Sequence, residues 1–430
     1  MVGSSPGGGA LTEVAAPSSA GPGGITTDPD TPNGYRRPEE LQQRFAAAAQ
    51  TLLERDGWRN PQKGDRRELV ADLALEGGGV KGIALAGAVL VLSEAGYRFR
   101  GVAGTSAGAI AASLIAAISK SGQEMSALKT CMDSMQFSNF MPEGKLHEFL
   151  DHHGGKPGEL IADAAILTHR MGLYPGDYLE EWLTPHLQSF GADTFGDLKL
   201  SSEEDPGMSL PDGHDYRLVV HTSDITREEL VRLPWDYPIY GYSPDDQAVV
   251  KAVRASISIP FFFEPVAFET RAADVPTPTP DGRTVTRHYA AGTSTLVDGG
   301  MLRNFPIGAF DRADGKAPRW PTIGIKLSSL QTDFPATSGC QSAIAVGIRC
   351  LKTMMNEWDA YAVDAATAGR TIFVDNGGLT ATQFDLTSAQ QDMLFLNGVS
   401  AATEFVIEMA QAGGVPRTPD DARRRLMPPN

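Results

Sequence analysis

Short apolar runs and longer mixed runs alternate along this chain, and their lengths predict strands and helices. LVADLAL (69–75) is short and almost wholly apolar, as expected of a strand buried on both faces. KGIALAGAVLVLSEAG (81–96) follows it with helical length and a glycine at its end. FRGVA (99–103) and the small-residue run AGAIAASLIAAI (107–118) repeat this plan. Two strand–turn–helix units in series predict a parallel sheet with helices on its faces.

The remaining periodic segments predict further elements of the same kinds. The stretch PEELQQRFAAAAQTLLERDG, from Pro38 to Gly57, predicts an amphipathic first helix, and the Pro-rich stretch 271–288 predicts a surface hairpin or loop. Other helices are predicted around 175–190, 340–365 and 399–412, and strands within 215–225, 295–298, 321–329 and 370–375.

These elements predict an α/β protein, a three-layer α/β/α fold with a mainly parallel central sheet. Residues 1–36 are rich in Gly, Pro, Ser and Thr and poor in bulky apolar side chains, so we expect a disordered tail there. Residues 37–68 are expected to form an N-terminal helical segment, 69–415 the main domain and 416–430 a C-terminal tail.

Composition and charge narrow the classes of partner. The formal charge of −16 argues against nucleic-acid binding and against stable docking on an anionic membrane, so any membrane contact should be transient and apolar. The apolar run 83–92 is about half as long as a membrane-spanning helix. The N-terminus lacks the pattern of a secretory signal, which predicts a cytoplasmic location and leaves non-classical secretion open. Three scattered cysteines predict reduced thiols, and the oligomeric state stays open.

The glycine cluster GGGVKG (77–82) raises the question of which anion its backbone N–H groups receive. It satisfies G-x-G-x-x-G between a predicted strand and a predicted helix. A dinucleotide site also needs an acidic residue at the end of the second strand, where this chain has GTSAG. A phosphate-binding P-loop needs Lys after the last glycine, where this chain has Ile83.

GTSAG (104–108) matches the G-x-S-x-G nucleophile elbow in strand–turn–helix context. A serine on such a turn requires a strained backbone and no Cβ two residues to either side, so Gly104 and Gly108 have a physical role. Ser106 would then lie at a helix N-terminus, at the same sheet edge as the glycine loop. We therefore predict that the backbone N–H groups of this loop bind an oxyanion.

Three motifs in this order give the chain a resemblance to the patatin-like phospholipase family. They are EGGGVKG (76–82), GTSAG and DGGMLRNFP (298–306), and ASISIPFFF (255–263) resembles a further segment of that family. The resemblance extends over about 69–415. Glu76 replaces the Asp that is frequent in the family, whereas Lys81 conforms to it.

The resemblance implies a lipid acyl hydrolase that needs no metal or other cofactor and cleaves a phospholipid or another acyl-ester lipid. It assigns a catalytic Ser-Asp dyad to Ser106 and Asp298. It also implies an oxyanion hole, formed in this chain by Gly77, Gly78, Gly79 and Lys81. The remaining motif glycines, which it assigns to the turns, are Gly82, Gly104, Gly108, Gly299 and Gly300.

The distribution of histidines also favours a dyad, although it leaves a His-based triad open because chain order varies among unrelated folds. A hydrolase triad in the order Ser, Asp, His needs a late histidine, and the last one here is His288, beside the Pro-rich stretch. His221 lies within a predicted strand and is interpreted as a satisfied core or strand-end histidine. Asp298 ends an apolar run at the expected sheet edge, and as a base it should have a raised pKa through burial. Asn304 and Pro306 are expected to shape the following loop.

Two other functions remain open on the sequence alone. The glycine loop could serve a nucleotide-binding module, or the chain could be a lipid-binding or storage protein without turnover. Two further patterns are interpreted as structural. Phe261, Phe262 and Phe263 are expected in the core rather than along an acyl channel, and His152 and His153 beside Asp151 are expected to be solvated rather than metal ligands.

Overall fold

The structure is a computed structural model of the 430-residue chain. Its description covers 20–59, 67–140, 171–200, 214–279, 282–312, 318, 320–327, 346–347, 349–350, 353–354, 365–381 and 383–418. Most of the helix predicted over 340–365, the His152–His153 pair and the C-terminal residues from 419 onward lie outside these residues.

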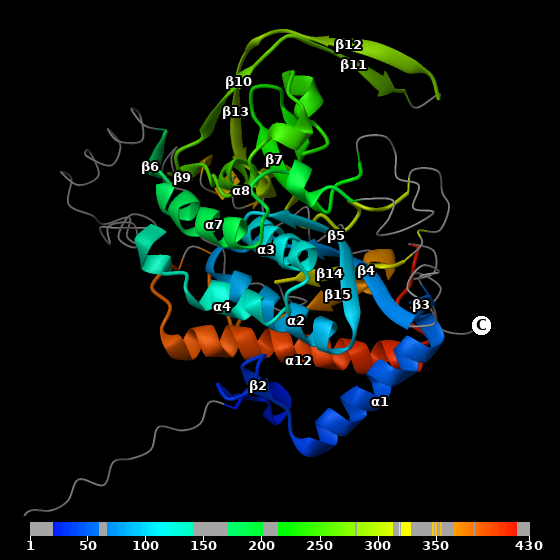
Figure 1. The fold of residues 1–430 in the computed structure, drawn as a ribbon. Coiled ribbons are helices and arrows are strands. Elements are labelled where there is room, and N and C mark those ends of the chain that lie inside the picture. Colours follow the sequence, from blue (N-terminus) through cyan, green and yellow to red (C-terminus); the bar gives the residue numbers. More distant parts are fainter. Residues whose placement is uncertain are drawn as a thin grey trace, which may run out of the picture.

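A nine-stranded sheet forms the centre of the molecule (Figure 1). Its main path is β10-β13-β7-β5-β4-β14-β15, with β3 beside β4 and β8 beside β7. The strands from β7 to β15 along this path are parallel, and β10, β13, β8 and β3 pair antiparallel. The bounds are β3 Trp58–Arg59, β4 Arg67–Leu75, β5 Tyr97–Thr105, β7 Leu218–Asp224, β8 Glu229–Leu233, β10 Val266–Thr270, β13 Gly292–Asp298, β14 Thr322–Lys326 and β15 Thr371–Phe373.

Helices cover both faces of this sheet, which confirms the predicted α/β/α fold. On one face α3 packs against β5 and β7, α8 packs against β7 and β13, and α2 is covered by α12. On the other face Phe305 and Ile307 pack against Ala74 of β4, and α9 contacts β7 and β8. The helix bounds are α1 Glu39–Asp56, α2 Ile83–Glu94, α3 Ala107–Ser121, α4 Ala127–Asp133, α7 Asp177–Ser189, α8 Val249–Ser256, α9 Gly300–Arg303, α11 Ala365–Ala368 and α12 Ser388–Ala412.

Glycines allow α2 and α12 to cross at close range. A Cβ on Gly87 would lie 2.3 Å from the carbonyl oxygen of Phe395, and one on Gly398 would lie 2.0 Å from that of Ala84. Because α2 is then enclosed between the sheet and α12, it is apolar all round, as a fully buried helix should be.

Helix α12 begins at Ser388, eleven residues before the start that the sequence predicted. Its Thr387 and Gln390 form a capping box, which fixes this beginning. Of the described helices it is the one long and apolar enough to cross a membrane, but 72% of its most apolar window is buried inside the protein. Its apolar composition is therefore explained by its place in the core.

Three small pairs of strands lie outside the central sheet. The stretch 271–288 contains the predicted hairpin, β11 (Ala273–Pro278) with β12 (Thr284–Tyr289), which extends over the top of the molecule in Figure 1. At the left edge of the molecule in Figure 1, β6 (Gly172–Tyr174) pairs in parallel with β9 (Phe261–Phe263). At the N-terminus β1 (Thr26–Thr27) pairs with β2 (Tyr35–Arg36).

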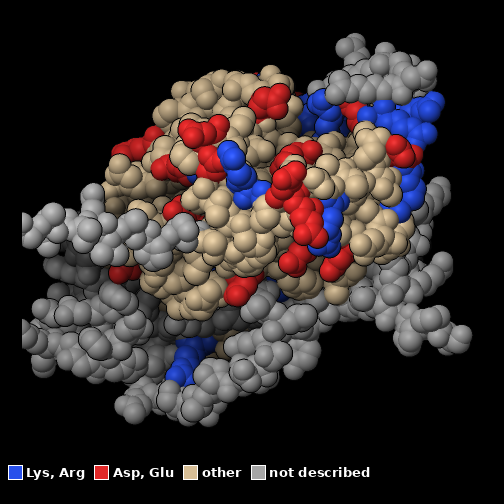
Figure 2. All heavy atoms as spheres, turned by 90° about the horizontal axis from the view of Figure 1, so that it is seen from below, with Lys and Arg blue, Asp and Glu red and all other residues tan. Residues whose placement is uncertain are grey.

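The surface charges are mixed on the face drawn in Figure 2. Acidic side chains lie across the middle of this face, and Lys and Arg gather toward one side. This distribution agrees with the net charge of −16 and differs from the continuous basic surface that phosphate backbones require.

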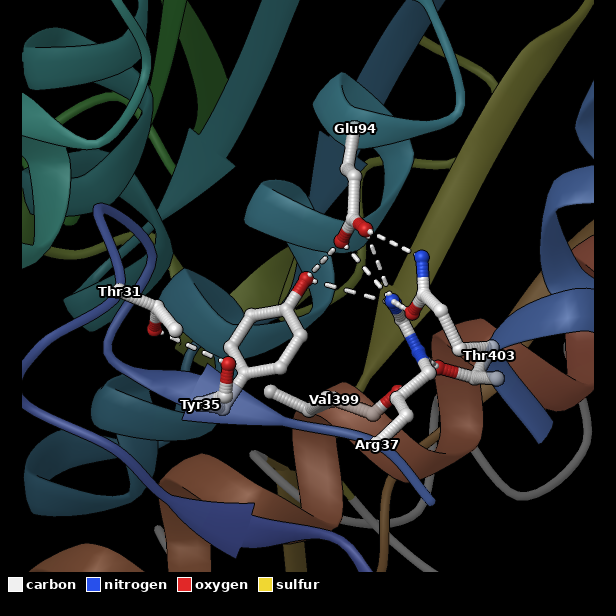
Figure 3. A network of polar contacts seen from close by, with 7 residues as sticks. Thr31, Tyr35, Arg37, Glu94, Val399 and Thr403 are labelled. Atoms are coloured by element: carbon white, nitrogen blue, oxygen red, sulfur yellow. Dashed lines mark hydrogen bonds and ion pairs between the residues drawn. The ribbon is translucent and has the colours of Figure 1, made fainter. Parts of the chain in front are cut away.

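Residues 20–36 differ from the predicted disordered tail. Ile25 is fully buried and Tyr35 is almost fully buried in the main hydrophobic core. Figure 3 shows the polar network that holds this segment: Arg37 donates two hydrogen bonds to Glu94 at the end of α2, at 2.9 and 3.0 Å, and one to Thr403 of α12 at 2.9 Å. The average composition of 1–36 therefore did not indicate that a few side chains in or next to this segment anchor it to the core.

Arg37 should therefore contribute strongly to folding stability. Its side chain is 1% exposed, its guanidinium lies 3.9 Å from the centre of the Phe45 ring, and Glu94 is 27% exposed. We expect Arg37→Ala to lower the free energy of unfolding by about 2–4 kcal/mol, because it removes a buried guanidinium together with its hydrogen bonds to Glu94 and Thr403. Arg36→Ala is the matched control: Arg36 is 69% exposed and pairs with Asp28, so it should cost at most about 1 kcal/mol. Equal urea midpoints for the two variants would contradict this assignment.

Candidate active site

Ser106 lies on a sharp turn between β5 and α3. Its backbone angles are φ 53° and ψ −124°, a region that costs a non-glycine residue about 1–3 kcal/mol. A Cβ on Gly104 would lie 2.2 Å from the carbonyl oxygen of Gly108, and one on Gly108 would lie 2.3 Å from that of Leu75. The predicted reason for the two glycines is thus confirmed: strand, turn and helix approach too closely for side chains.

Asp298 ends β13 beside this turn. It is fully buried, and its Oδ1 accepts a hydrogen bond from the N–H of Gly300 at 2.7 Å. Its Oδ2 has no partner of regular hydrogen-bond geometry, yet the Ser106 side chain is close enough to lower the pKa of the carboxyl. We take this contact as close but imperfectly aligned, as is common for catalytic pairs without substrate. Burial dominates and raises the pKa of Asp298 to about 7, in the direction predicted for a base.

The two glycines after Asp298 allow its loop to pass beside the neighbouring strand. A Cβ on Gly299 would lie 2.3 Å from the carbonyl oxygen of His221 and 3.1 Å from the Thr105 methyl group. Gly300 supplies the N–H that holds Asp298 Oδ1. Both glycines therefore bring the carboxyl next to the end of β5.

The glycine loop lies against the same turn. A Cβ on Gly77 would lie 3.0 Å from the Cβ of Ser106. Gly77 donates its N–H to the carbonyl oxygen of Asn304 at 3.0 Å and accepts from Asn304 Nδ2 at 3.1 Å. The expectation that Gly77 supplies an oxyanion donor is thus corrected, because this N–H is already paired. Among described residues, the N–H groups of Gly78 and Gly79 donate to no acceptor, and Asn304 shapes the loop as expected.

Contacts with later segments fix the conformation of this loop. Gly79 has φ +57°, and a Cβ there would lie 1.8 Å from the carbonyl oxygen of Ala381, to which Val80 donates its N–H. Glu76, at the beginning of the loop, is buried and pairs with Lys326 Nζ and with the N–H of Leu327.

Lys81 lies in the same turn, where its backbone N–H donates to the carbonyl oxygen of Gly78 at 3.3 Å, and its ammonium has no hydrogen bond to a described residue. Burial lowers the pKa of its ammonium, Glu76 opposes this change and Lys326 adds to it. Gly82 contacts α3, since a Cβ there would lie 3.1 Å from that of Ala107.

Segment 254–258 contacts both Ser106 and Asp298, which the sequence did not predict. Ser256 Oγ accepts a hydrogen bond from the N–H of Ser106 at 2.9 Å and donates to the carbonyl oxygen of His221 at 2.6 Å. The carbonyl oxygen of Ser258 accepts from the N–H of Asp298 at 2.9 Å. The small residues in ASISIP were a signal of close packing, but their partners could not be read from the chain.

The two late histidines occupy different places. His221 lies on β7, opposite Thr105 of β5, and is buried. Neither of its ring nitrogens has a well-formed hydrogen bond to a described residue, although the Arg303 backbone is near enough to raise its pKa, so the expectation of a satisfied histidine is not met. Burial lowers its pKa to about 3, which keeps the ring neutral at ordinary pH. His288 is exposed on the hairpin, where it pairs with Asp274 at 2.6 Å.

The described residues contain no group of three His, Cys, Asp or Glu side chains suited to a metal ion. Phe262 and Phe263 are buried as expected, whereas Phe261 is 43% exposed and differs from that expectation. Phe261 and Met171 both have positive φ, at 68° and 60°, an unusual conformation for bulky residues.

Two comparisons relate this chain to known proteins. The family model described as patatin-like phospholipase matches residues 73–311, more than half of the chain. The uncharacterized protein YqhO of Bacillus subtilis (strain 168) is 34% identical over 320 residues, which cover 74% of this chain and 92% of YqhO.

Similar solved structures include two bacterial proteins. VipD from Legionella pneumophila has 15% identity and a TM-score of 0.38, over 78% of this chain and 66% of VipD. The type III effector ExoU, known also in complex with SpcU from Pseudomonas aeruginosa, has 16% identity and a TM-score of 0.40, over 80% of this chain and 54% of ExoU. The chain thus spans only about half to two thirds of these proteins, and their low TM-scores add nothing to the argument about the site.

The family match includes the glycine loop, the serine turn and Asp298, and the YqhO alignment extends the relationship over most of both chains. These two matches and the observed fold show that the chain belongs to the patatin-like phospholipase family.

Proposed function

We propose that this protein hydrolyses carboxylic esters of lipids through an acyl-enzyme on Ser106, with Asp298 as the general base. One observation carries the proposal: a fully buried carboxyl keeps one oxygen without a regular partner beside a serine held at positive φ. A buried, incompletely paired carboxylate is costly to a fold, and a strained nucleophile adds to that cost. Both features are expected where a reaction requires them.

The reaction follows from this arrangement. Asp298 takes the hydroxyl proton of Ser106 while Oγ attacks the ester carbonyl carbon, and the carbonyl oxygen becomes an oxyanion. Collapse of this intermediate breaks the ester bond, and the proton passes from Asp298 to the departing alcohol. Asp298 then takes a proton from water, which attacks the acyl-enzyme, and the proton returns to Ser106 as the fatty acid leaves.

The N–H groups of Gly78 and Gly79 are our proposed donors to the oxyanion. Within the described part of the chain these two N–H groups have no acceptor, and their loop lies against Ser106 and is fixed by Asn304 and Ala381. Rigid donors of this kind stabilise the transition state without reorganisation. The ammonium of Lys81, which has no partner among described residues, adds positive charge close to them.

The substrate class follows from the family, which acts on lipids, and we propose a phospholipid or another acyl-ester lipid. With a net charge of −16, contact with a lipid surface should be transient and apolar rather than electrostatic. Phe261 and Met171, 43% and 62% exposed at the start of the β9–β6 pair, are the proposed contacts.

The nucleotide-binding alternative is weakened by the loop contacts. A nucleotide phosphate would need several free N–H groups, but Gly77 and Val80 already donate to Asn304 and Ala381. A lipid-binding protein without turnover would have the same fold, so only a measurement of hydrolysis separates it from an enzyme.

The dyad is tested by labelling and turnover. A fluorophosphonate probe should label the wild-type protein at Ser106, and Ser106→Ala should abolish both labelling and ester hydrolysis. Asp298→Asn can still accept from the N–H of Gly300 but cannot take a proton, so turnover should fall by about 10²–10⁴-fold. His288→Ala, on the exposed hairpin, is the control and should keep full activity. Labelling at another serine would refute the assignment.

The substrate is identified by a second experiment. Wild type and Ser106→Ala are compared on mixed lipid vesicles, and the lipid that only wild type consumes is the substrate.

The pH dependence of kcat/KM should reflect the ionisation of the Asp298 carboxyl. The base acts in its deprotonated form, and its pKa is raised to about 7, so kcat/KM should rise with pH through an inflection near 7. His221, with a pKa lowered to about 3, cannot produce that inflection. Asp72 is an internal control, since burial also raises its pKa to about 7 but it bonds Gly101 and Trp320 instead of the serine. Asp72→Asn should leave the inflection in place, and its disappearance would mean that the profile reports folding.

The oxyanion loop has its own test. A Cβ on Gly78 would lie 2.6 Å from Leu327 Cδ1 and 3.4 Å from Lys81 Cε, so Gly78→Val should turn the N–H away and lower kcat by about 10²–10³-fold. Gly292→Val is the matched control, because no atom lies within 4 Å of a Cβ there. Full activity of Gly78→Val on a soluble ester would show that this glycine only shapes the loop.

A further inference from the structure

The nucleophile and the base are joined through one short segment that belongs to neither of their motifs. Ser256, at the end of α8, binds the backbone of Ser106, and Ser258, two residues later, binds the backbone of Asp298. Both serines are fully buried. The dyad therefore has a common support that reaches it from α8, in addition to the sheet.

The Ser256 hydroxyl has one proton and two lone pairs, and its partners use them in a defined way. The proton is donated to the carbonyl oxygen of His221 on β7, at 2.6 Å. A lone pair accepts the N–H of Ser106, at 2.9 Å. The side chain thus bridges two neighbouring parallel strands at the point where β5 turns into α3.

This bridge is made at the place where the backbone is strained. Ser106 keeps φ at 53° only if its surroundings hold it there, because a serine that is free to relax would leave this region. Its N–H is buried with Ser256 as acceptor, so relaxation would also leave this buried donor and a lone pair of the Ser256 hydroxyl without a partner.

Arg254 ties the same segment to the β6–β9 pair. Its guanidinium donates to Ser258 Oγ, to the carbonyl oxygen of Glu264 after β9 at 2.9 Å, and to that of Pro175 after β6. Ser258 Oγ in turn donates to the carbonyl oxygen of Arg254 at 2.9 Å. The segment is therefore fixed at both ends before it meets the dyad.

We propose that Ser256 is a positioning residue: its hydroxyl holds the backbone of Ser106 in the attacking conformation and in register with Asp298. The inference rests on the proposed function, since it concerns the same serine and aspartate. Ser256 touches neither the substrate nor the transferred proton. Its removal should therefore slow the attack without changing the pKa of the base or the affinity for substrate.

Ser256→Ala tests this role, with Ser113→Ala as the matched control. Ser113 is also fully buried and lies in α3, but its Oγ donates to the carbonyl oxygen of Ile110 within that helix. Both changes remove one buried hydroxyl. We expect Ser256→Ala to lower kcat on a soluble short-chain ester, and the rate of fluorophosphonate labelling, by about 10²-fold with KM within about 2-fold, as small misplacements of reacting groups do elsewhere. Ser113→Ala should keep both rates within about 2-fold.

Two further measurements separate positioning from loss of folding. Rates are normalised to the folded fraction from circular dichroism, and the inflection of kcat/KM near pH 7 should be unchanged in Ser256→Ala because Asp298 is intact. Ser256→Cys, which keeps a side chain of similar size with weaker hydrogen bonds, should fall between wild type and alanine, and it serves as the test should the alanine variant not fold.

The outcomes distinguish the inference from the proposed function. If wild-type protein is neither labelled nor active, the proposed function fails. The positioning role alone fails if wild type is active but Ser256→Ala has the same rates as Ser113→Ala. It also fails if the pH inflection of Ser256→Ala moves. A cysteine variant with full activity, beside an alanine variant that loses only stability, would contradict it as well.

Discussion

The structure depends on one constraint, the conformation of Ser106 between β5 and α3. A serine with φ at 53° is stable only when neighbouring groups prevent its relaxation. Here the end of β4 approaches through Gly108, the glycine loop approaches through Gly77, and α8 supplies the Ser256 hydroxyl. The order of strands, the glycines at their ends and the helix above them all contribute to the same turn.

Close backbone contact makes the motifs interdependent. Gly77 exchanges two hydrogen bonds with Asn304, so the oxyanion loop and the loop after Asp298 hold each other. A Cβ on Gly77 would lie 3.0 Å from the carbonyl oxygen of Thr105, and one on Gly108 would lie 2.7 Å from that of Glu76, so the glycine loop and the serine turn need these glycines where they meet. The glycine loop thus packs against the serine turn and also bonds to the loop after Asp298. These contacts explain why three short stretches far apart in sequence form one site.

The sequence contained enough to predict the sheet, the serine turn and the place of Asp298, because each depends on a local pattern: an apolar run that ends in glycines. It could not show that the N–H of Gly77 is paired, since that depends on Asn304, 227 residues away. Ser256 escaped prediction for the same reason. The folded segment 20–36 was hidden differently: its average composition is that of a disordered tail, while Ile25 and Tyr35 are buried in the core and Arg37, directly after the segment, bonds to Glu94.

Burial also bears on the proposed role of Asp298 as a general base, a role that histidine has in many other serine hydrolases. An exposed carboxyl, with a pKa near 4, is a poor base for a serine at neutral pH. Loss of solvent around Asp298 raises its pKa to about 7, the normal range of an imidazole, while the N–H of Gly300 keeps the ionised form accessible. His221, equally buried, is shifted in the opposite direction because its charged form is the cation. The same desolvation therefore suits the carboxyl to the base that we propose and leaves the neighbouring imidazole neutral, because the two side chains carry opposite charges when ionised.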